Sequence, residues 1–285
     1  MTIRSKAVWG MCLALLVAAG PAFAQDPAAQ ATPPAQPATS NPDSRLDPLQ
    51  PDFNLAALPT TLRMPAGKSA FRVTHRFSRP LGRGDFSDLL SDFFGFDSGA
   101  QIGLEVRFGL MPGTQIGVHR TSDRTIQIFG QQNLLQQTAD GHPIGLDVMA
   151  TLEGTNNLRA QKSSALGLLM SRKAGRRLAL YVEPMVVVNS NPADVNEDNH
   201  TAMIGLGARV RIRPATYLVG EFTPRVAGYK PGVDQGSFGI EMRSGGHTFQ
   251  INISNGSGTT LGQLTDSGVG GDSWFIGFNI SRKFF

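Results

Sequence analysis

Apolar and polar residues alternate in segments that recur from residue 70 to the end of the chain. In the last of them, Ile276, Phe278 and Ile280 alternate with glycine and asparagine. A period of two is typical of a β-strand with one apolar and one polar face. The segments are 70–78, 100–110, 113–121, 124–132, 143–153, 163–172, 177–189, 200–213, 216–227, 236–244, 246–254 and 273–285. The pattern predicts an all-β protein of about twelve strands.

The connections between these segments form two sets that alternate along the chain. Short connections lie at 111–113, 173–176, 214–215 and 245, and 133–142 is the one longer member of that set. The other set is rich in Gly, Asn, Asp and Ser and comprises 79–99, 154–162, 190–199, 228–235 and 255–272. In a bacterial barrel with an even number of strands, both chain ends lie on the periplasmic side and every second connection is a tight turn. The alternation predicts a transmembrane antiparallel up-and-down β-barrel and disfavours a soluble sandwich.

Glycines on the polar face of the strands indicate which face points inward. They are Gly103, Gly145, Gly205, Gly207, Gly239 and Gly277. Glycine is an unusual choice for a solvent-exposed strand position, whereas it suits the inner wall of a narrow barrel, where it leaves room for neighbouring arginines. The apolar face is therefore predicted to contact lipid, and the polar face to line the lumen.

The predicted lumen carries many charges of both signs. The inward positions are Arg72, Arg76, Glu105, Arg107, His119, Asp147, Glu183, Arg209, Arg211, Glu221, Arg225, Glu241 and Arg243, joined by Tyr181, Asn252 and Asn279. Isolated charges in a confined space are costly, so networks of paired glutamates and arginines are expected. Two interpretations stay open: a wet core that holds the barrel's shape, or a narrow, slightly cationic conduit for small or anionic solutes.

The loop at 79–99 contains apolar residues at helical spacing. They are Phe86, Leu89, Leu90, Phe93 and Phe94, and Asp85 stands where an N-cap is expected. The spacing predicts a short amphipathic helix in the first outer loop. This helix either packs on the rim or in the outer-leaflet interface, or folds into the mouth of the barrel as a gate.

The beginning of the chain has the features of a secretory signal peptide. Arg4 and Lys6 precede an apolar run at 7–20, and Ala22 and Ala24 form a small-residue cleavage site. Residues 1–24 are therefore predicted to be removed. Residues 25–57 are predicted to be a disordered Pro/Ala-rich spacer that ends in a segment docked loosely on the barrel's inner end, and residues 58–285 to be the barrel domain.

Composition narrows the candidate chemistry. The formal charge is +4 over the whole chain, and the basic residues are spread among glutamates, which disfavours nucleic-acid binding. The single cysteine lies in the predicted signal peptide, and the five histidines have no metal-ligand spacing. No catalytic residue, metal or cofactor is predicted, and the protein is not expected to be an enzyme. A lipid hydrolase using His119 is the least favoured alternative.

Several short stretches resemble a known family. They are Leu58-Pro59-Thr60, the strand around His75-Arg76-Phe77, Phe94-Gly95-Phe96-Asp97, and Gly103 to Gly109. With them, the chain resembles a family of uncharacterised bacterial β-barrel proteins, catalogued as a domain of unknown function, over about residues 45–285. The terminal aromatic strand resembles the closing strand of outer-membrane barrels. The resemblance implies an outer-membrane barrel, and it implies no substrate and no catalytic residue.

Together these features predict a monomer in the bacterial cell outer membrane. Its expected partners are the lipid bilayer and the barrel-assembly machinery, with small solutes as further candidates and no nucleic acid. The expected role is a narrow pore or a structural barrel with a charge-filled lumen. The alternative is a surface-exposed binding or adhesion barrel without solute flux.

Overall fold

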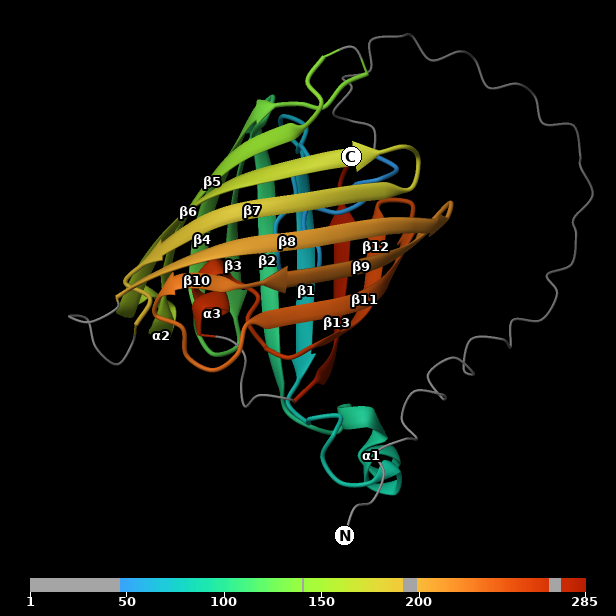
Figure 1. The fold of residues 1–285 in the computed structure, drawn as a ribbon, viewed down its shortest axis with the longest axis vertical. Coiled ribbons are helices and arrows are strands. Elements are labelled where there is room, and N and C mark those ends of the chain that lie inside the picture. Colours follow the sequence, from blue (N-terminus) through green and yellow to red (C-terminus); the bar gives the residue numbers. More distant parts are fainter. Residues whose placement is uncertain (1–46, 140, 192–198, 267–272) are drawn as a thin grey trace, which may run out of the picture. The chain divides into compact units, whose positions relative to one another are not determined.

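The computed structural model describes residues 47–139, 141–191, 199–266 and 273–285. The predicted signal peptide and residues 25–46 of the predicted spacer lie outside this part of the chain. The described residues form one antiparallel sheet that closes on itself (Figure 1).

Most strands pair with their neighbours along the chain, and β1 pairs with β13 to close the barrel. The exception is β10, which pairs with β8, so that β9 pairs with β11. The strands are β1 Ser69–Phe77, β2 Ala100–Met111, β3 Thr114–Thr121, β4 Ile126–Leu135, β5 Gly145–Gly154, β6 Ala160–Ala174, β7 Leu178–Val188, β8 His200–Arg213, β9 Thr216–Thr223, β10 Arg225–Gly228, β11 Gln235–Ser244, β12 His247–Ser254 and β13 Phe275–Lys283.

Pro224 separates β9 from β10, although both strands pair with β8. Proline has no N–H to donate, so it interrupts a β ladder. Its carbonyl still accepts a hydrogen bond from the Ile204 amide at 3.0 Å, which keeps the two pieces in line. Strand β10 thus continues β9, and the wall has twelve strand positions. The predicted twelve-stranded antiparallel barrel is confirmed, with one extra short strand.

The two rims of the barrel differ. We call the rim where β1 begins and β13 ends the terminal rim, and the opposite one the loop rim. Tight turns at the terminal rim include 112–113, 214–215 and 245–246, as predicted. The loop rim holds the long loops 78–99 and 255–274. Alternation in length is nevertheless incomplete, because 122–125 and 155–159 at the loop rim are short as well.

Within the described ranges, the helical segments belong to connections at the loop rim. They are α1 Phe86–Ser91, the 3-10 turn η2 Phe93–Gly95, α2 Thr155–Leu158 and α3 Leu261–Thr265 (Figure 1). Among the described residues, no helix is long and apolar enough to cross a bilayer.

The outer wall is apolar. Along β2, Leu104, Val106 and Phe108 are exposed, whereas the alternate residues Glu105 and Arg107 are buried. A water-soluble protein rarely exposes a continuous apolar surface of this extent, whereas a lipid-facing wall requires one. The sheet therefore turns its apolar face outward, and the polar face lines the lumen.

Helix α1 forms where the sequence predicted it, and side chains at its N-terminus cap it. Asp85 accepts hydrogen bonds from the amides of Ser87 (2.8 Å) and Asp88 (3.0 Å), and Asp88 accepts one from the Asp85 amide (3.0 Å). This reciprocal pair is a capping box. None of the residues of α1 is buried, and Arg79 pairs with Asp92 at the end of the helix.

The predicted gate residues therefore do not enter the lumen in this structure. Phe86, Leu90 and Phe93 are exposed, and Leu89 and Phe94 are half-buried. Phe93 packs on Phe96, and Phe96 on Phe77 at the end of β1, which holds the segment at the outside of the rim. The helix lies at this rim because the lumen is filled by other parts of the chain.

Replacing Asp85 with alanine is expected to unfold α1 and to leave the barrel intact, because the cap holds only this loop. The Asp88 amide, and then Ser87, hold the pKa of Asp85 below its ordinary value. The cap is therefore complete above the ordinary pKa and weakens as the pH falls through the lowered one. Limited proteolysis within 80–99 should speed up in the variant, with the barrel fragment unchanged. Unchanged cleavage would contradict the role of the cap.

Candidate functional site

Residues 49–64 run inside the barrel, and we call this segment the plug. Phe53, Leu55, Leu58 and Met64 are all buried. The sequence predicted loose docking at the inner end, whereas the structure places the segment within the lumen. The predicted domain boundary between residues 57 and 58 falls inside the plug, and the first strand of the wall begins only at Ser69.

One side of the plug packs on an apolar part of the wall. A Cβ atom built on Gly205 would lie 2.9 Å from Cδ2 of Leu58, and one built on Gly207 would overlap Leu55. The sequence predicted that glycines on this face leave room for arginines. These two glycines of β8 instead make room for leucines of the plug. Gly277 does lie beside Arg76 in the expected way, since its Cβ would be 2.8 Å from the arginine Cδ.

The apolar part of the lumen continues beyond these contacts. Met149, Leu169, Met185 and Met203 of β5 to β8 belong to the same buried cluster as Leu55 and Leu58. This cluster is absent from the predicted lumen residues, which are all charged or polar. The signal was present, since these methionines occupy inward positions of strands that otherwise read as polar on that face.

The other side of the plug faces charged and polar groups of the wall. Arg72 and Arg76 of β1 and Asn279 of β13 all donate to the carbonyl of Ala56, Arg76 at 3.1 Å and Asn279 at 3.0 Å. Arg209 of β8 donates to the carbonyl of Asn54 at 2.9 Å. The plug backbone therefore accepts hydrogen bonds from three arginines of the wall.

Glu221 of β9 holds the plug through its amide groups. Its carboxylate accepts hydrogen bonds from the backbone N–H groups of Ala56 (3.0 Å), Ala57 (2.9 Å) and Leu58 (3.0 Å). Charge-assisted hydrogen bonds of this kind are about twice as strong as neutral ones. Glu221 is buried, so water does not compete for these bonds.

The plug is anchored at both of its ends. Asp52 accepts a hydrogen bond from Ser281 at 2.7 Å and lies 3.5 Å from Nζ of Lys283, both on β13. Gln131 of β4 donates to the carbonyl of Thr60 at 2.8 Å, and the Thr61 hydroxyl contacts that of Ser171 on β6. The plug thus bridges opposite parts of the wall.

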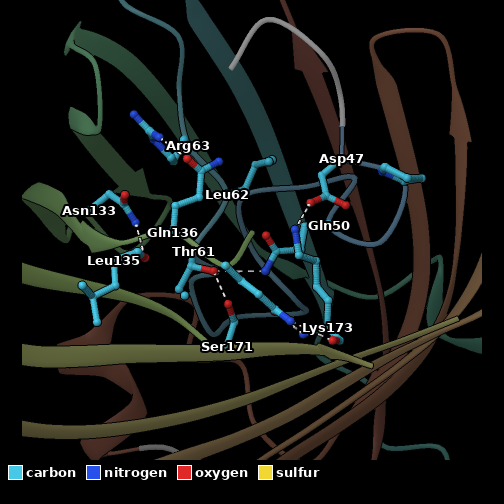
Figure 2. Close-up of a pocket in the computed structure, with 13 residues that line it drawn as sticks. Asp47, Gln50, Thr61, Leu62, Arg63, Asn133, Leu135, Gln136, Ser171 and Lys173 are labelled. Atoms are coloured by element: carbon cyan, nitrogen blue, oxygen red, sulfur yellow. Dashed lines mark hydrogen bonds and ion pairs between the residues drawn. The ribbon is translucent and has the colours of Figure 1, made fainter. Parts of the chain in front are cut away.

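Beside the plug, a polar pocket of about 240 Å³ opens at the terminal rim. Figure 2 shows Thr61 between Gln50 and Ser171 in this pocket, and Lys173 paired with Asp47 at 2.8 Å. The plug is therefore reachable from this rim at Thr61.

Helix α3 closes the lumen from the loop rim. Leu261 and Leu264 are buried in the same apolar cluster as the plug leucines. Glu153 accepts a hydrogen bond from the Gly262 amide at 3.2 Å, and Arg225 donates to the carbonyl of Thr265 at 2.9 Å. A small cavity of about 10 Å³ remains between α3, the plug and the wall, roughly the space of one water molecule.

The structure gathers most of the predicted lumen residues inside the barrel. The buried ones are Arg72, Arg76, Glu105, Arg107, His119, Asp147, Glu183, Arg209, Glu221, Arg225 and Glu241, with Tyr181, Asn252 and Asn279. Arg211 and Arg243 are only half-buried, and Arg211 donates to the carbonyl of Pro214 in the turn after β8. These two arginines sit near the terminal rim and contact neither the plug nor α3 by any hydrogen bond of the described residues.

Some of the charged side chains of the lumen form ion pairs with each other, and others form hydrogen bonds with the plug backbone. Arg209 pairs with Glu241 at 3.0 Å and Arg107 with Glu105 at 2.9 Å, which is the type of network expected. Glu183 is fully buried, and neither of its carboxylate oxygens has a hydrogen-bond partner. Within the described ranges, no three His, Cys, Asp or Glu side chains are grouped so as to hold a metal ion.

A family model described as "Membrane bound beta barrel domain (DUF5777)" matches residues 52–284, which confirms the resemblance inferred from the sequence. No curated protein matches the chain in sequence.

Among solved structures, the NanC porin superposes with a TM-score of 0.51 at 9% identity, covering 76% of this chain and 100% of that one. The KdgM porin, solved in complex with disordered oligogalacturonate, gives 0.50 at 6%, covering 76% and 99%. Outer membrane phospholipase A from Escherichia coli gives 0.44 at 12%, covering 77% and 91%, and this likeness is too low to bear on activity. The two porins support the fold alone.

Proposed function

Because the chain belongs to the family of membrane-bound β-barrel domains (DUF5777), we propose that it is an outer-membrane barrel that acts as a self-plugged narrow pore. With residues 49–64 inside, the barrel does not conduct. When the plug leaves, small solutes pass. The observation that carries this proposal is the plug itself, whose backbone is bound by Arg72, Arg76 and Glu221 of the wall.

The wall closes independently of the plug. Strand β1 pairs with β13 along seven residue pairs, from Ala70 with Lys283 to Arg76 with Gly277, and no residue of the plug takes part in this seam. The plug is joined to the wall covalently only through residues 65–68, which lead into β1. It can therefore leave without breaking the ladder of the barrel, unlike side chains that belong to the wall.

We also propose that the protein has no catalytic activity. His119 lies 3.9 Å from Glu105, and its Nε2 atom has no hydrogen-bond partner. Ser122, the serine nearest to it in sequence, lies in the turn after β3, where it accepts a hydrogen bond from the Ile102 amide. A nucleophile needs a base within hydrogen-bond reach, and these two side chains do not meet. Lipid hydrolysis that is lost in His119→Ala would contradict this proposal.

A disulfide between plug and wall is expected to lock the pore shut. The hydroxyls of Thr61 and Ser171 are in hydrogen-bond contact, so cysteines at these two positions place their sulfurs within reach of each other. In planar bilayers, Thr61→Cys/Ser171→Cys should lose its channel openings on oxidation and regain them on reduction.

The single variants Thr61→Cys and Ser171→Cys are the controls, and neither should respond to the oxidant. The natural chain has one cysteine, Cys12, which lies in the predicted signal peptide. Openings that persist in the oxidised double variant would show that solutes pass without movement of the plug. A reduced variant and a natural protein that never open would favour a structural barrel without flux.

A further inference from the structure

The wall forms hydrogen bonds with both the carbonyl and the N–H of a single peptide group of the plug. The carbonyl oxygen of Ala56 accepts hydrogen bonds from Arg72, Arg76 and Asn279. The next amide, the N–H of Ala57, belongs to the same peptide group and donates to Glu221. Basic groups of β1 and an acidic group of β9 thus meet across one peptide bond.

The basic side of this site has more donors than a carbonyl can use. Nε of Arg72 and Nε of Arg76 are buried and have no hydrogen-bond partner. Oε2 of Glu105 lies 3.7 Å from Nη1 of Arg72, which is too long for a hydrogen bond, while Oε1 accepts one from Arg107. A guanidinium carries five donors in a planar fork that matches a carboxylate. A ligand with two anionic oxygens would satisfy these arginines better than the neutral carbonyl of Ala56 does.

The acidic side restricts which anions fit. Glu221 accepts hydrogen bonds from three N–H groups of the plug. If an anion without N–H donors took the place of the plug, the carboxylate of Glu221 would be left buried without hydrogen bonds. A buried carboxylate without hydrogen bonds is costly, and a second negative charge beside it is repelled. The ligand must therefore bring N–H donors next to its carboxylate.

We propose that Arg72, Arg76, Asn279 and Glu221 form a binding site for amino acids or short peptides, which the Ala56–Ala57 peptide group occupies while the plug is in place. The carboxylate of the ligand binds the two arginines and Asn279, and its ammonium or amide N–H binds Glu221. This inference deepens the proposed pore, since it names the solute class that competes with the plug.

A route to the site exists at the loop rim. A pocket of about 220 Å³ is lined by Arg76, Phe77, Gln101 and Phe275, among others. Arg76 therefore lies at the boundary between this pocket and the plug. Because Arg76 is only 1% exposed, a solute in this pocket would reach its guanidinium as the plug moves aside.

The test follows displacement of the plug in the full chain with glycylglycine as the probe. Ala57 is buried, so a cysteine at this position should react with a maleimide only when the plug has left. Glycylglycine should accelerate labelling of Ala57→Cys at a concentration about tenfold or more below that needed for acetate or inorganic phosphate, because only the dipeptide supplies N–H donors to Glu221. Equal potency of the three probes would overturn the proposal, and greater potency of phosphate would indicate a phosphate site instead.

Side-chain variants connect the effect to the site. Arg72→Gln, in the Ala57→Cys background, should lose the response to glycylglycine even if its basal labelling rises. Arg177→Gln, at an exposed position, is the matched control and should respond like the parent. An unchanged response in Arg72→Gln would overturn the proposed site. Conductance is recorded in parallel: accelerated labelling without openings contradicts the pore and keeps the site, whereas openings without any effect of glycylglycine contradict the site alone.

Discussion

Replacing Glu221 with alanine is expected to release the plug and to convert a closed barrel into a conducting one. The substitution removes the acceptor of three backbone N–H groups in a buried environment. Each buried donor left without a partner costs about 1–3 kcal/mol. The plugged state should therefore lose at least about 3 kcal/mol relative to the open state, which corresponds to roughly a hundredfold change in the equilibrium between them. Single-channel recording measures this as the open fraction.

Two variants separate this effect from a change in net charge. Glu221→Gln keeps an oxygen acceptor of the same shape and should open the barrel less than alanine does. Asp97→Ala removes one negative charge from an exposed position in the first loop and should leave the open fraction unchanged. A closed Glu221→Ala barrel with normal folding would show that the carboxylate does not retain the plug.

Replacing Gly207 with valine is expected to expel the plug by a steric route. Any side chain at this position of β8 overlaps Leu55, and Leu55 is buried with little room to shift. Overpacking of a well-filled core costs about 1–3 kcal/mol. The open fraction should therefore rise by about fivefold to a hundredfold or more. The nearest wall side chain, Tyr181 of β7, would lie 3.4 Å from the new Cβ, an ordinary van der Waals distance, so the barrel should still assemble.

The matched rescue is Leu55→Ala in the Gly207→Val background, which removes the overlapping methyl groups and should restore closure. Gly130→Val is the control for placing a β-branched residue in a strand, because a Cβ on Gly130 meets no atom within 4 Å. If the double variant conducts as strongly as Gly207→Val alone, the overlap with Leu55 is not the cause of opening.

The wall could be predicted from the sequence because its signal is local. The segment 200–213 coincides with β8, and 216–227 covers β9 and β10 on both sides of Pro224. Each strand alternates between lipid and lumen, so the period of two survives the whole length of a strand. Strand ends agree less closely: β6 begins at Ala160 and ends at Ala174, beyond both limits of the predicted segment 163–172.

The plug could not be predicted, because its place depends on distant parts of the chain. Leu49, Phe53, Leu55 and Leu58 follow neither a period of two nor a helical period, so no local pattern announces their environment. Their neighbours include glycines and methionines of β5 to β8, and Ala56, which lies among them in the chain, is hydrogen bonded to β1, β9 and β13. The amphipathic loop was predicted as a helix either on the rim or inside the mouth. Phe86 and Leu90 belong to that helix, which lies at the rim, while the plug and α3 fill the lumen.

The plug precedes β1 in the chain, and its partners include the strand that closes the barrel. The amide of Ala56 and its acceptor Glu221 are 165 residues apart, and the donor Asn279 is 223 residues beyond the carbonyl it binds. The plug is thus synthesised before every strand that binds it. Its full set of hydrogen bonds exists only once β9 and β13 have joined the barrel.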